Sequence, residues 1–219
     1  MILYTNGCSY TANQNVPENL RYPRLLSDQL GWKLVDNSWP GSSNSRIIRT
    51  TTRDCLNLKQ SSQDKIFAQI QLTHLHRFEC PSTGAWTTNN DRIIINDNFV
   101  SIKFNQENLP VDIEKYAKLF WKIYNNRAIW TMLLISLIGL ISFFKQHDID
   151  YLIYFGPQEK YELQTEDIVL LQELQSDSKI LDLLGFSMLE TITKSSYHPD
   201  IIGNKLIADY FFNLLCEQA

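Results

Sequence analysis

The first dozen residues constrain the fold most, because an apolar run passes directly into a turn. Ile2, Leu3 and Tyr4 are followed by the turn formers Asn6 and Gly7. A short apolar run bounded by turn residues predicts a central parallel strand that is covered on both faces. A glycine permits the backbone angles of a sharp reversal. The residues after it are therefore expected at the carboxyl edge of the sheet, where open α/β sheets bind ligands.

Ser9 follows this glycine by two positions and is the candidate nucleophile. A serine is activated for attack when a base such as histidine reaches its hydroxyl. His198 is the candidate base, because it precedes Pro199, a residue that opens helices, so the imidazole is expected on a loop. The alternative is that Ser9 only caps the next helix, which is a common role for a serine at this kind of position.

Two short motifs carry a resemblance to a known superfamily. Gly7-Cys-Ser-Tyr10 near the start, and the pattern His-Pro-x-x-x-Gly-x-x-x-x-Ala beginning at His198, resemble the first and last blocks of the SGNH/GDSL hydrolases. Those proteins are serine esterases and lipases. The resemblance implies an α/β fold, a three-layer, doubly wound, flavodoxin-like parallel sheet with helices on both faces. It also implies that Ser9 is the nucleophile and His198 the base.

The stretch 37–44 resembles the second block of the same superfamily. The resemblance implies that the backbone N–H of Gly41 faces the oxyanion, together with the N–H of Ser9. Asn44 ends this stretch and is expected to contact the substrate. The alternative for Gly41 is structural, since any Pro-Gly pair before a helix makes a good turn.

The third and last blocks depart from the superfamily pattern. The usual Gly-x-Asn-Asp is absent from the end of the third strand, where Gln71, Thr73 or His74 is left as the side-chain donor to the oxyanion. A missing donor costs about 3 to 4 kcal/mol of transition-state stabilisation, which predicts slow or narrow activity. The aspartate of the last block is replaced by Ser195. The resemblance then implies a Ser-His dyad oriented by a backbone carbonyl or by Ser195, and neither Glu79 nor Asp200 is assigned a triad role.

Strand and helix patterns alternate along the chain, which predicts right-handed crossovers and a parallel sheet. Strands are predicted at 2–4, 32–36, 64–73 and 151–156, and helices at 22–31, 46–58, 112–147, 165–175 and 199–216. The second of these helices is capped by Ser42, Ser43 or Asn44. The segment 112–147 is one long helix or a kinked pair. A β-hairpin is predicted at 91–104, inside an insertion spanning 80–110 that overhangs the site.

Length and composition favour one globular domain spanning residues 1–219. The chain has 44% hydrophobic and 20% charged residues, which is ordinary for a globular protein. Its net charge of -4 does not indicate the basic surface that nucleic-acid binding needs. The four cysteines are scattered and the histidines lack metal-ligand spacing, so we expect reduced thiols and neither a metal nor another cofactor. The oligomeric state is left open.

The stretch 128–144 carries no charge and raises the question of a membrane anchor. It is shorter than the roughly 20 residues that a spanning helix needs, and polar residues and Gly139 interrupt it. We favour a helix of a soluble protein, buried on most of its circumference, with the anchor as the alternative. The start of the chain lacks the features of a signal peptide, which predicts a cytoplasmic protein.

Three residues near the predicted insertion are candidates for substrate binding: Arg77, Glu79 and Trp86. A guanidinium suits a carboxylate or phosphate, and an indole stacks on sugar faces. The alternative is that Arg77 and Glu79 pair with each other on the surface. The resemblance to the SGNH/GDSL hydrolases implies a hydrolase of small-molecule or glycan esters, an O-acetyl group on a carbohydrate being one such ester. A binding or structural module that keeps the fold without the chemistry is the second hypothesis.

Overall fold

The computed structural model describes residues 1–81, 99–102, 111–156, 165–175 and 198–217. The strands are β1 (Ile2–Asn6), β2 (Lys33–Asp36), β3 (Ile66–Leu72), β4 (Phe78–Pro81), β5 (Phe99–Ile102) and β6 (Asp150–Phe155). The helices are α1 (Ser9–Ala12), α2 (Tyr22–Leu30), α3 (Asn44–Ser61), α4 (Val111–Ile123), α5 (Asn126–Gln146), α6 (Thr165–Gln175) and α8 (Ile201–Glu217), with a short 3-10 helix η1 (Glu18–Leu20).

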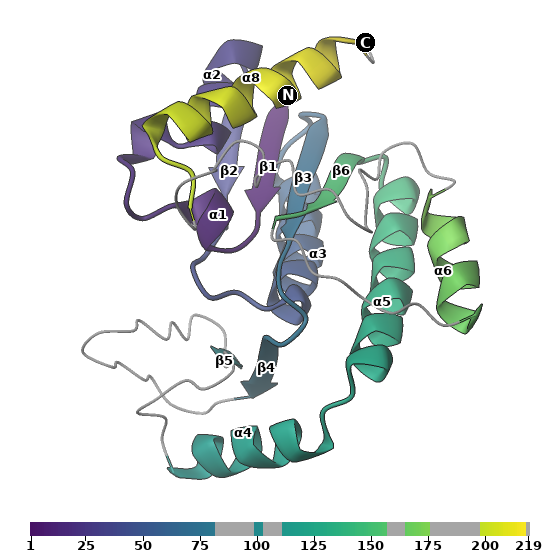
Figure 1. Cartoon of the computed structure of the whole chain (residues 1–219). Coiled ribbons are helices and arrows are strands. Elements are labelled where there is room, and N and C mark those ends of the chain that lie inside the picture. The colour runs from purple at the N-terminus through teal and green to yellow at the C-terminus, as the bar shows by residue number, and fades with distance from the viewer. Residues whose placement is uncertain (82–98, 103–110, 157–164, 176–197, 218–219) are drawn as a thin grey trace.

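Four strands form a parallel sheet in the order β2-β1-β3-β6. The chain passes from β1 outward to β2, then returns across β1 to β3, so the direction of winding reverses between β1 and β3 (Figure 1). This reversal is a topological switch point, and ligands of such sheets bind outside the carboxyl ends of the strands there. The predicted α/β class with a doubly wound parallel sheet is confirmed.

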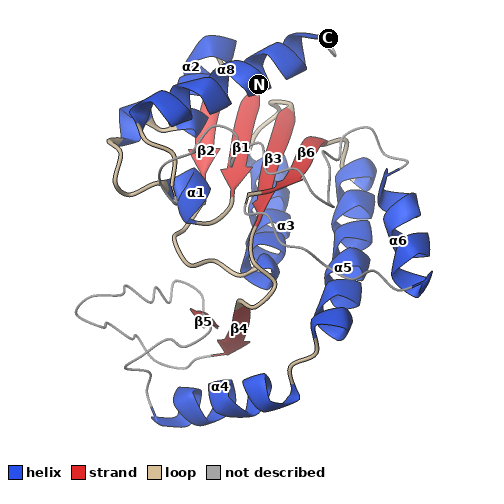
Figure 2. Cartoon of the chain, in the orientation of Figure 1, coloured by secondary structure: helices blue, strands red, loops and turns tan. Residues whose placement is uncertain are grey.

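Helices cover both faces of this sheet. On one face Leu3 and Phe67 belong to a buried cluster with Leu26 of α2 and Phe211 of α8, and these two helices lie side by side (Figure 1). On the other face the strands pack against α3 and α5, and α6 lies against α5 (Figure 2). Every residue of β1 and β3 is buried, as expected for strands covered on both faces.

The predicted helix ends follow local chemistry. Gly31 has φ 66 directly after α2, the left-handed conformation that ends helices at little cost for a glycine. Ser43 is the cap of α3, because its hydroxyl accepts a hydrogen bond from the backbone N–H of Arg46. Of the three caps that the sequence left open, the structure selects this one.

The segment 112–147 is the kinked pair rather than one helix. α4 ends at Ile123, and α5 begins again behind Asn125, whose side chain accepts hydrogen bonds from the N–H groups of Arg127 and Ala128. An asparagine at a helix start satisfies N–H groups that would otherwise lack acceptors. The two helices point in different directions from this break (Figure 1).

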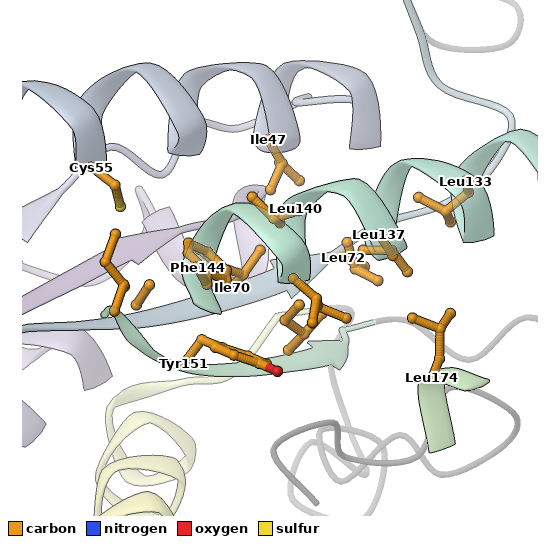
Figure 3. Packing of buried hydrophobic residues seen from close by; sticks show 14 of the residues in the cluster. Ile47, Cys55, Ile70, Leu72, Leu133, Leu137, Leu140, Phe144, Tyr151 and Leu174 are labelled. Atoms are coloured by element: carbon orange, nitrogen blue, oxygen red, sulfur yellow. The ribbon is translucent and has the colours of Figure 1, made fainter. Parts of the chain in front are cut away.

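Helix α5 packs one apolar stripe on the sheet. Its buried residues follow helical spacing, and they are Trp130, Leu133, Leu134, Leu137, Leu140, Ile141 and Phe144. Figure 3 shows several of them against β3, α3 and β6. The opposite face exposes Met132 and Ile135, so the prediction that most of the circumference is buried was wrong. By length and composition alone α5 also qualifies as a membrane span within the described ranges.

The insertion holds a two-stranded antiparallel pair beyond the carboxyl edge of the main sheet (Figure 2). β5 falls in the second half of the predicted hairpin, and its partner is β4. The predicted first half, 91–95, and the predicted turn at 96–98 lie outside the described residues. Phe78 of β4 packs with Phe120 and Trp121 of α4, which gives this part a small core of its own.

The packing of α5 predicts a contrast between two leucine-sized residues of one helix. Leu137 is 1% exposed and Ile135 is 55% exposed. We expect Leu137→Ala to lower the free energy of unfolding by about 2 to 5 kcal/mol, since it leaves a cavity in the core. Ile135→Ala should change it by roughly 0.5 kcal/mol or less. Urea unfolding followed by circular dichroism measures both, and equal effects would contradict the packing described here.

Candidate active site

Ser9 lies directly after the carboxyl end of β1, as the first residue of α1. The cap position before it is Cys8, which makes no side-chain capping hydrogen bond. The alternative in which Ser9 caps the helix is therefore wrong. Its side chain is partly exposed, and its hydroxyl has no hydrogen-bond partner within the described ranges. The turn thus presents an uncommitted hydroxyl at the edge where such sheets bind ligands.

His198 is brought to the same edge by the loop before α8. Its ring lies against the ring of Tyr10, the neighbour of Ser9, with centroids 5.0 Å apart and planes inclined by 30°. The imidazole is partly buried. No hydrogen bond joins it to the Ser9 hydroxyl in the described structure, and such bonds are often long until substrate is bound. The first and last motifs of the chain therefore meet at one place.

The carbonyl oxygen of Pro199 holds this loop in position. Asn13, at the end of α1, and Asn204, in the first turn of α8, both donate side-chain N–H groups to it. The amide oxygen of Asn204 in turn accepts from the backbone N–H of Tyr22 at 2.9 Å. Sequence reasoning missed both asparagines, although their nearness to the Ser9 and His198 motifs was a usable signal.

Asp200 has a structural task, as the sequence indicated. Its carboxylate accepts from the backbone N–H of Gly203 at 2.7 Å and so caps α8. A carboxylate at a helix start also interacts favourably with the helix dipole. Position 195 lies outside the described residues.

Gly41 lies in a tight turn beside the end of β1. The N–H of Ser42 donates to the carbonyl of Trp39 at 3.1 Å, and Gly41 has φ 83. Proline then glycine at the two central positions, with positive φ at the glycine, is the pattern of a type II turn. The N–H of Trp39 donates to the carbonyl of Gly7 at 3.1 Å, which fastens this loop to the Ser9 turn.

Gln71 is buried behind the Ser9 turn, 1% exposed. Its amide oxygen accepts from the Thr11 hydroxyl and lies 3.8 Å from the Cys8 sulfur. Its amide nitrogen has no partner in the described ranges and faces Gly156. The side that Gln71 presents to the turn is thus an acceptor, which does not suit an oxyanion donor.

A chain of buried hydroxyls continues from this amide, through Thr11 and Tyr22, to Tyr154 of β6. The Tyr22 hydroxyl lies 3.0 Å from the Thr11 hydroxyl oxygen and 2.7 Å from the Tyr154 hydroxyl. Burial raises the pKa of both phenols, so both keep their protons over the ordinary pH range. The network supports the turn from behind as a neutral hydrogen-bonded unit.

Thr73 and Asn44 are bound to each other at the end of β3. The Asn44 amide donates to the Thr73 carbonyl at 2.9 Å and accepts from its N–H at 2.8 Å. Both residues are buried, and the Thr73 hydroxyl accepts from Arg77 at 3.0 Å. The structure therefore gives Asn44 a positioning task, joining the start of α3 to the third strand. His74 stacks on His76, with centroids 4.9 Å apart.

Arg77 and Glu79 do not pair with each other, so that alternative was wrong. Glu79 is held by Arg49 of α3 through two hydrogen bonds of 3.1 and 2.6 Å. Arg77 donates to the Thr73 hydroxyl and to the Ser42 carbonyl. Trp86 lies outside the described residues. Within those residues, no group of three His, Cys, Asp or Glu side chains is placed to hold a metal ion.

Solved structures share this fold over nearly the whole chain. Esterase EstA from Pseudoalteromonas sp., inhibited by monoethylphosphonate, matches with a TM-score of 0.54 and 10% identity over 99% of this chain and 97% of its own. The acetyl xylan esterase AlAXEase matches with a TM-score of 0.53 and 14% identity, covering 98% and 99%.

A lipolytic protein of the G-D-S-L family from Desulfitobacterium hafniense matches with a TM-score of 0.51 and 10% identity, covering 97% and 98%. No protein-family model and no curated protein matches the sequence. The chain therefore has an SGNH/GDSL hydrolase-like fold, as its first and last motifs predicted.

The space around two glycines predicts opposite effects of alanine on stability, because Gly156 packs against Gln71 and Gly139 faces open space. A Cβ on Gly156 would lie 1.7 Å from the Gln71 amide nitrogen, whereas a Cβ on Gly139 of α5 meets nothing within 4 Å. We expect Gly156→Ala to lower the free energy of unfolding by about 1 to 3 kcal/mol. Gly139→Ala should raise it by about 0.5 to 1 kcal/mol, because alanine favours a helix interior.

The clash itself is tested by combining Gly156→Ala with Gln71→Ala, followed by urea unfolding. Removal of the amide should abolish most of the cost of the added methyl group. A full, additive loss in the double variant would show that Gln71 is not what Gly156 makes room for.

Proposed function

We propose that this protein hydrolyses carboxylic esters through an acyl-enzyme formed on Ser9, with His198 as general base. The observation that carries the proposal is the meeting of the Ser9 turn and the His198 loop through the Tyr10 ring. These motifs are far apart in the sequence, and they converge at the switch point of a parallel sheet. The three solved structures that share the fold, two esterases and a lipolytic protein, support the same chemistry.

In the first step the Ser9 oxygen attacks the ester carbonyl while the His198 ring takes the hydroxyl proton. The protonated imidazole then gives this proton to the departing alcohol, and the acyl group stays on Ser9. A water molecule, deprotonated by the same imidazole, attacks the acyl-enzyme and releases the acid. The proton returns to Ser9, so the enzyme is regenerated.

The negative charge on the carbonyl oxygen needs donors during both steps. Among the described residues, no hydrogen bond engages the backbone N–H of Ser9 or of Gly41. The contact between Trp39 and Gly7 keeps their two turns adjacent. We assign the oxyanion site to these two N–H groups rather than to Gln71, whose oxygen faces the turn.

The base works here without the aspartate of the usual last block. A triad carboxylate orients the imidazole and stabilises its charged form, and it does not accept the proton. The fixed Pro199 carbonyl and the Tyr10 ring supply orientation. They supply no negative charge, which is consistent with a slower enzyme.

We propose a small acyl group, such as an O-acetyl group on a carbohydrate, as the substrate part that reaches Ser9. The support is the likeness in fold to an acetyl xylan esterase over nearly the full length of both chains.

Substitution of Ser9 is the direct test. The protein should hydrolyse 4-nitrophenyl acetate and be labelled by a fluorophosphonate at Ser9, since the reagent captures an activated serine. Ser9→Ala should lose the label and at least about a thousandfold in kcat. The matched control is Ser136→Ala on the exposed side of α5, which should keep both properties.

A folded wild-type protein that neither labels nor turns over would refute the hydrolase proposal. That result would favour the alternative of a module that keeps this fold for binding alone. Mass spectrometry of the labelled peptide distinguishes Ser9 from other serines.

A further inference from the structure

Arg77 is fixed between the loops that follow β2 and β3. One terminal nitrogen, Nη1, donates to the Thr73 hydroxyl at 3.0 Å and to the Ser42 carbonyl at 3.4 Å. Ser42 directly follows Gly41, whose N–H we assign to the oxyanion site. The guanidinium is therefore anchored one residue away from the place proposed for the reacting carbonyl.

Within the described residues, the other edge of this guanidinium makes no hydrogen bond. The Nε–H is buried without an acceptor, and within the described part of the chain no hydrogen bond is made by Nη2. No carboxylate of the described residues forms an ion pair with Arg77, and the side chain is partly exposed. A charged donor that is buried without an acceptor is unfavourable. Nη2 is not among the buried unpaired atoms, so a ligand anion can reach the guanidinium there.

The neighbouring Arg49 shows what such an edge binds. Its Nε and Nη2 donate in parallel to the two oxygens of Glu79, at 3.1 and 2.6 Å. This is the planar, two-bond arrangement in which a guanidinium recognises a carboxylate. Within the described residues the same two nitrogens of Arg77 make no hydrogen bond, and Nη2 is the one that a ligand can reach.

The charges around Ser42 favour an anion. Arg46 donates to the Ser42 hydroxyl at 3.1 Å while Arg77 donates to its carbonyl, so two cations share this residue. Glu79, the nearby carboxylate of β4, is already neutralised by Arg49. The positive potential of this edge contrasts with the net charge of -4 for the whole chain.

We propose that the solvent-accessible Nη2 of Arg77 binds a carboxylate of the substrate, so that the preferred substrates are esters carrying a carboxylate near the scissile bond. An acetylated acidic sugar has this chemistry. The position of the ester relative to Arg77 rests on the proposed hydrolase function. The binding of a carboxylate to Arg77 does not depend on hydrolysis and is tested by itself.

Binding is measured first in a background that cannot turn over. In Ser9→Ala, titration calorimetry with 4-acetoxybenzoate should show at least tenfold tighter binding than with its methyl ester, which lacks the negative charge and carries one more methyl group. Adding Arg77→Gln should abolish this preference. Adding Lys33→Gln, an equal loss of charge at the exposed start of β2, should leave it intact. Equal affinity for the two esters would overturn the proposal.

Arg77→Lys keeps the charge but lacks the planar pair of donors, and it decides the question if Arg77→Gln does not fold. The preference for the carboxylate should fall in this variant, because one ammonium nitrogen cannot both keep the bonds of Nη1 to Thr73 and Ser42 and replace Nη2 at the carboxylate. An undiminished preference would contradict the role of Nη2. Tighter binding of 4-acetoxybenzenesulfonate than of the carboxylate would also overturn it.

Turnover by the wild-type chain separates this proposal from the hydrolase proposal. A carboxylate preference in binding, without hydrolysis of either ester, supports carboxylate binding by Arg77 and refutes the hydrolase proposal. Hydrolysis of both esters at equal kcat/KM, unchanged by Arg77→Gln, refutes carboxylate binding by Arg77 and is consistent with the hydrolase proposal.

Discussion

The site depends on the hydrogen bonds that the carbonyl oxygen of Pro199 accepts. This oxygen accepts hydrogen bonds from Asn13 and Asn204, and the first of these joins residues 186 positions apart. The position of His198 relative to Ser9 is thus set by buried amides and not by strand pairing, since β6 is the last strand of the described sheet. Because a buried amide that loses its partner pays a large desolvation penalty, these bonds favour a single arrangement of the two motifs.

The Ser9 turn is supported from behind by polar groups in a position where a hydrophobic core would be the simpler solution. Gln71, Thr11 and two tyrosines form a continuous hydrogen-bonded chain between α1 and β6. Such a network is directional, so it fixes the turn more narrowly than apolar packing, which tolerates many similar arrangements. Gly7 and Gly156 make room for this network, because a side chain at either position would collide with the Gln71 amide.

The sequence predicted the parts of the structure that depend on apolar periodicity and turn chemistry. β1, the turn at Gly7 and the alternation of strands and helices follow from residues close in sequence, whereas the meeting of the first and last motifs was implied by the resemblance to the SGNH/GDSL hydrolases. The choice of hydrogen-bond partners did not, because it depends on distances between loops. Glu79 selects Arg49, 30 positions away, over Arg77 two positions away. The burial of α5 was overestimated because composition alone does not show which face meets the sheet.

The residue at the end of β3 explains how this site differs from one with a complete third block. Thr73 is fully buried and its hydroxyl is held by Arg77, so this side chain is packed inside the protein and is not presented to a substrate. A fixed cation stands behind it instead. Charge–charge attraction falls slowly with distance where water is partly excluded, so a guanidinium stabilises a developing oxyanion even without touching it. For an uncharged ester, Arg77 would offset part of the missing hydrogen bond, whereas a substrate carboxylate bound to Arg77 would neutralise that charge, so this residue would couple substrate choice to rate.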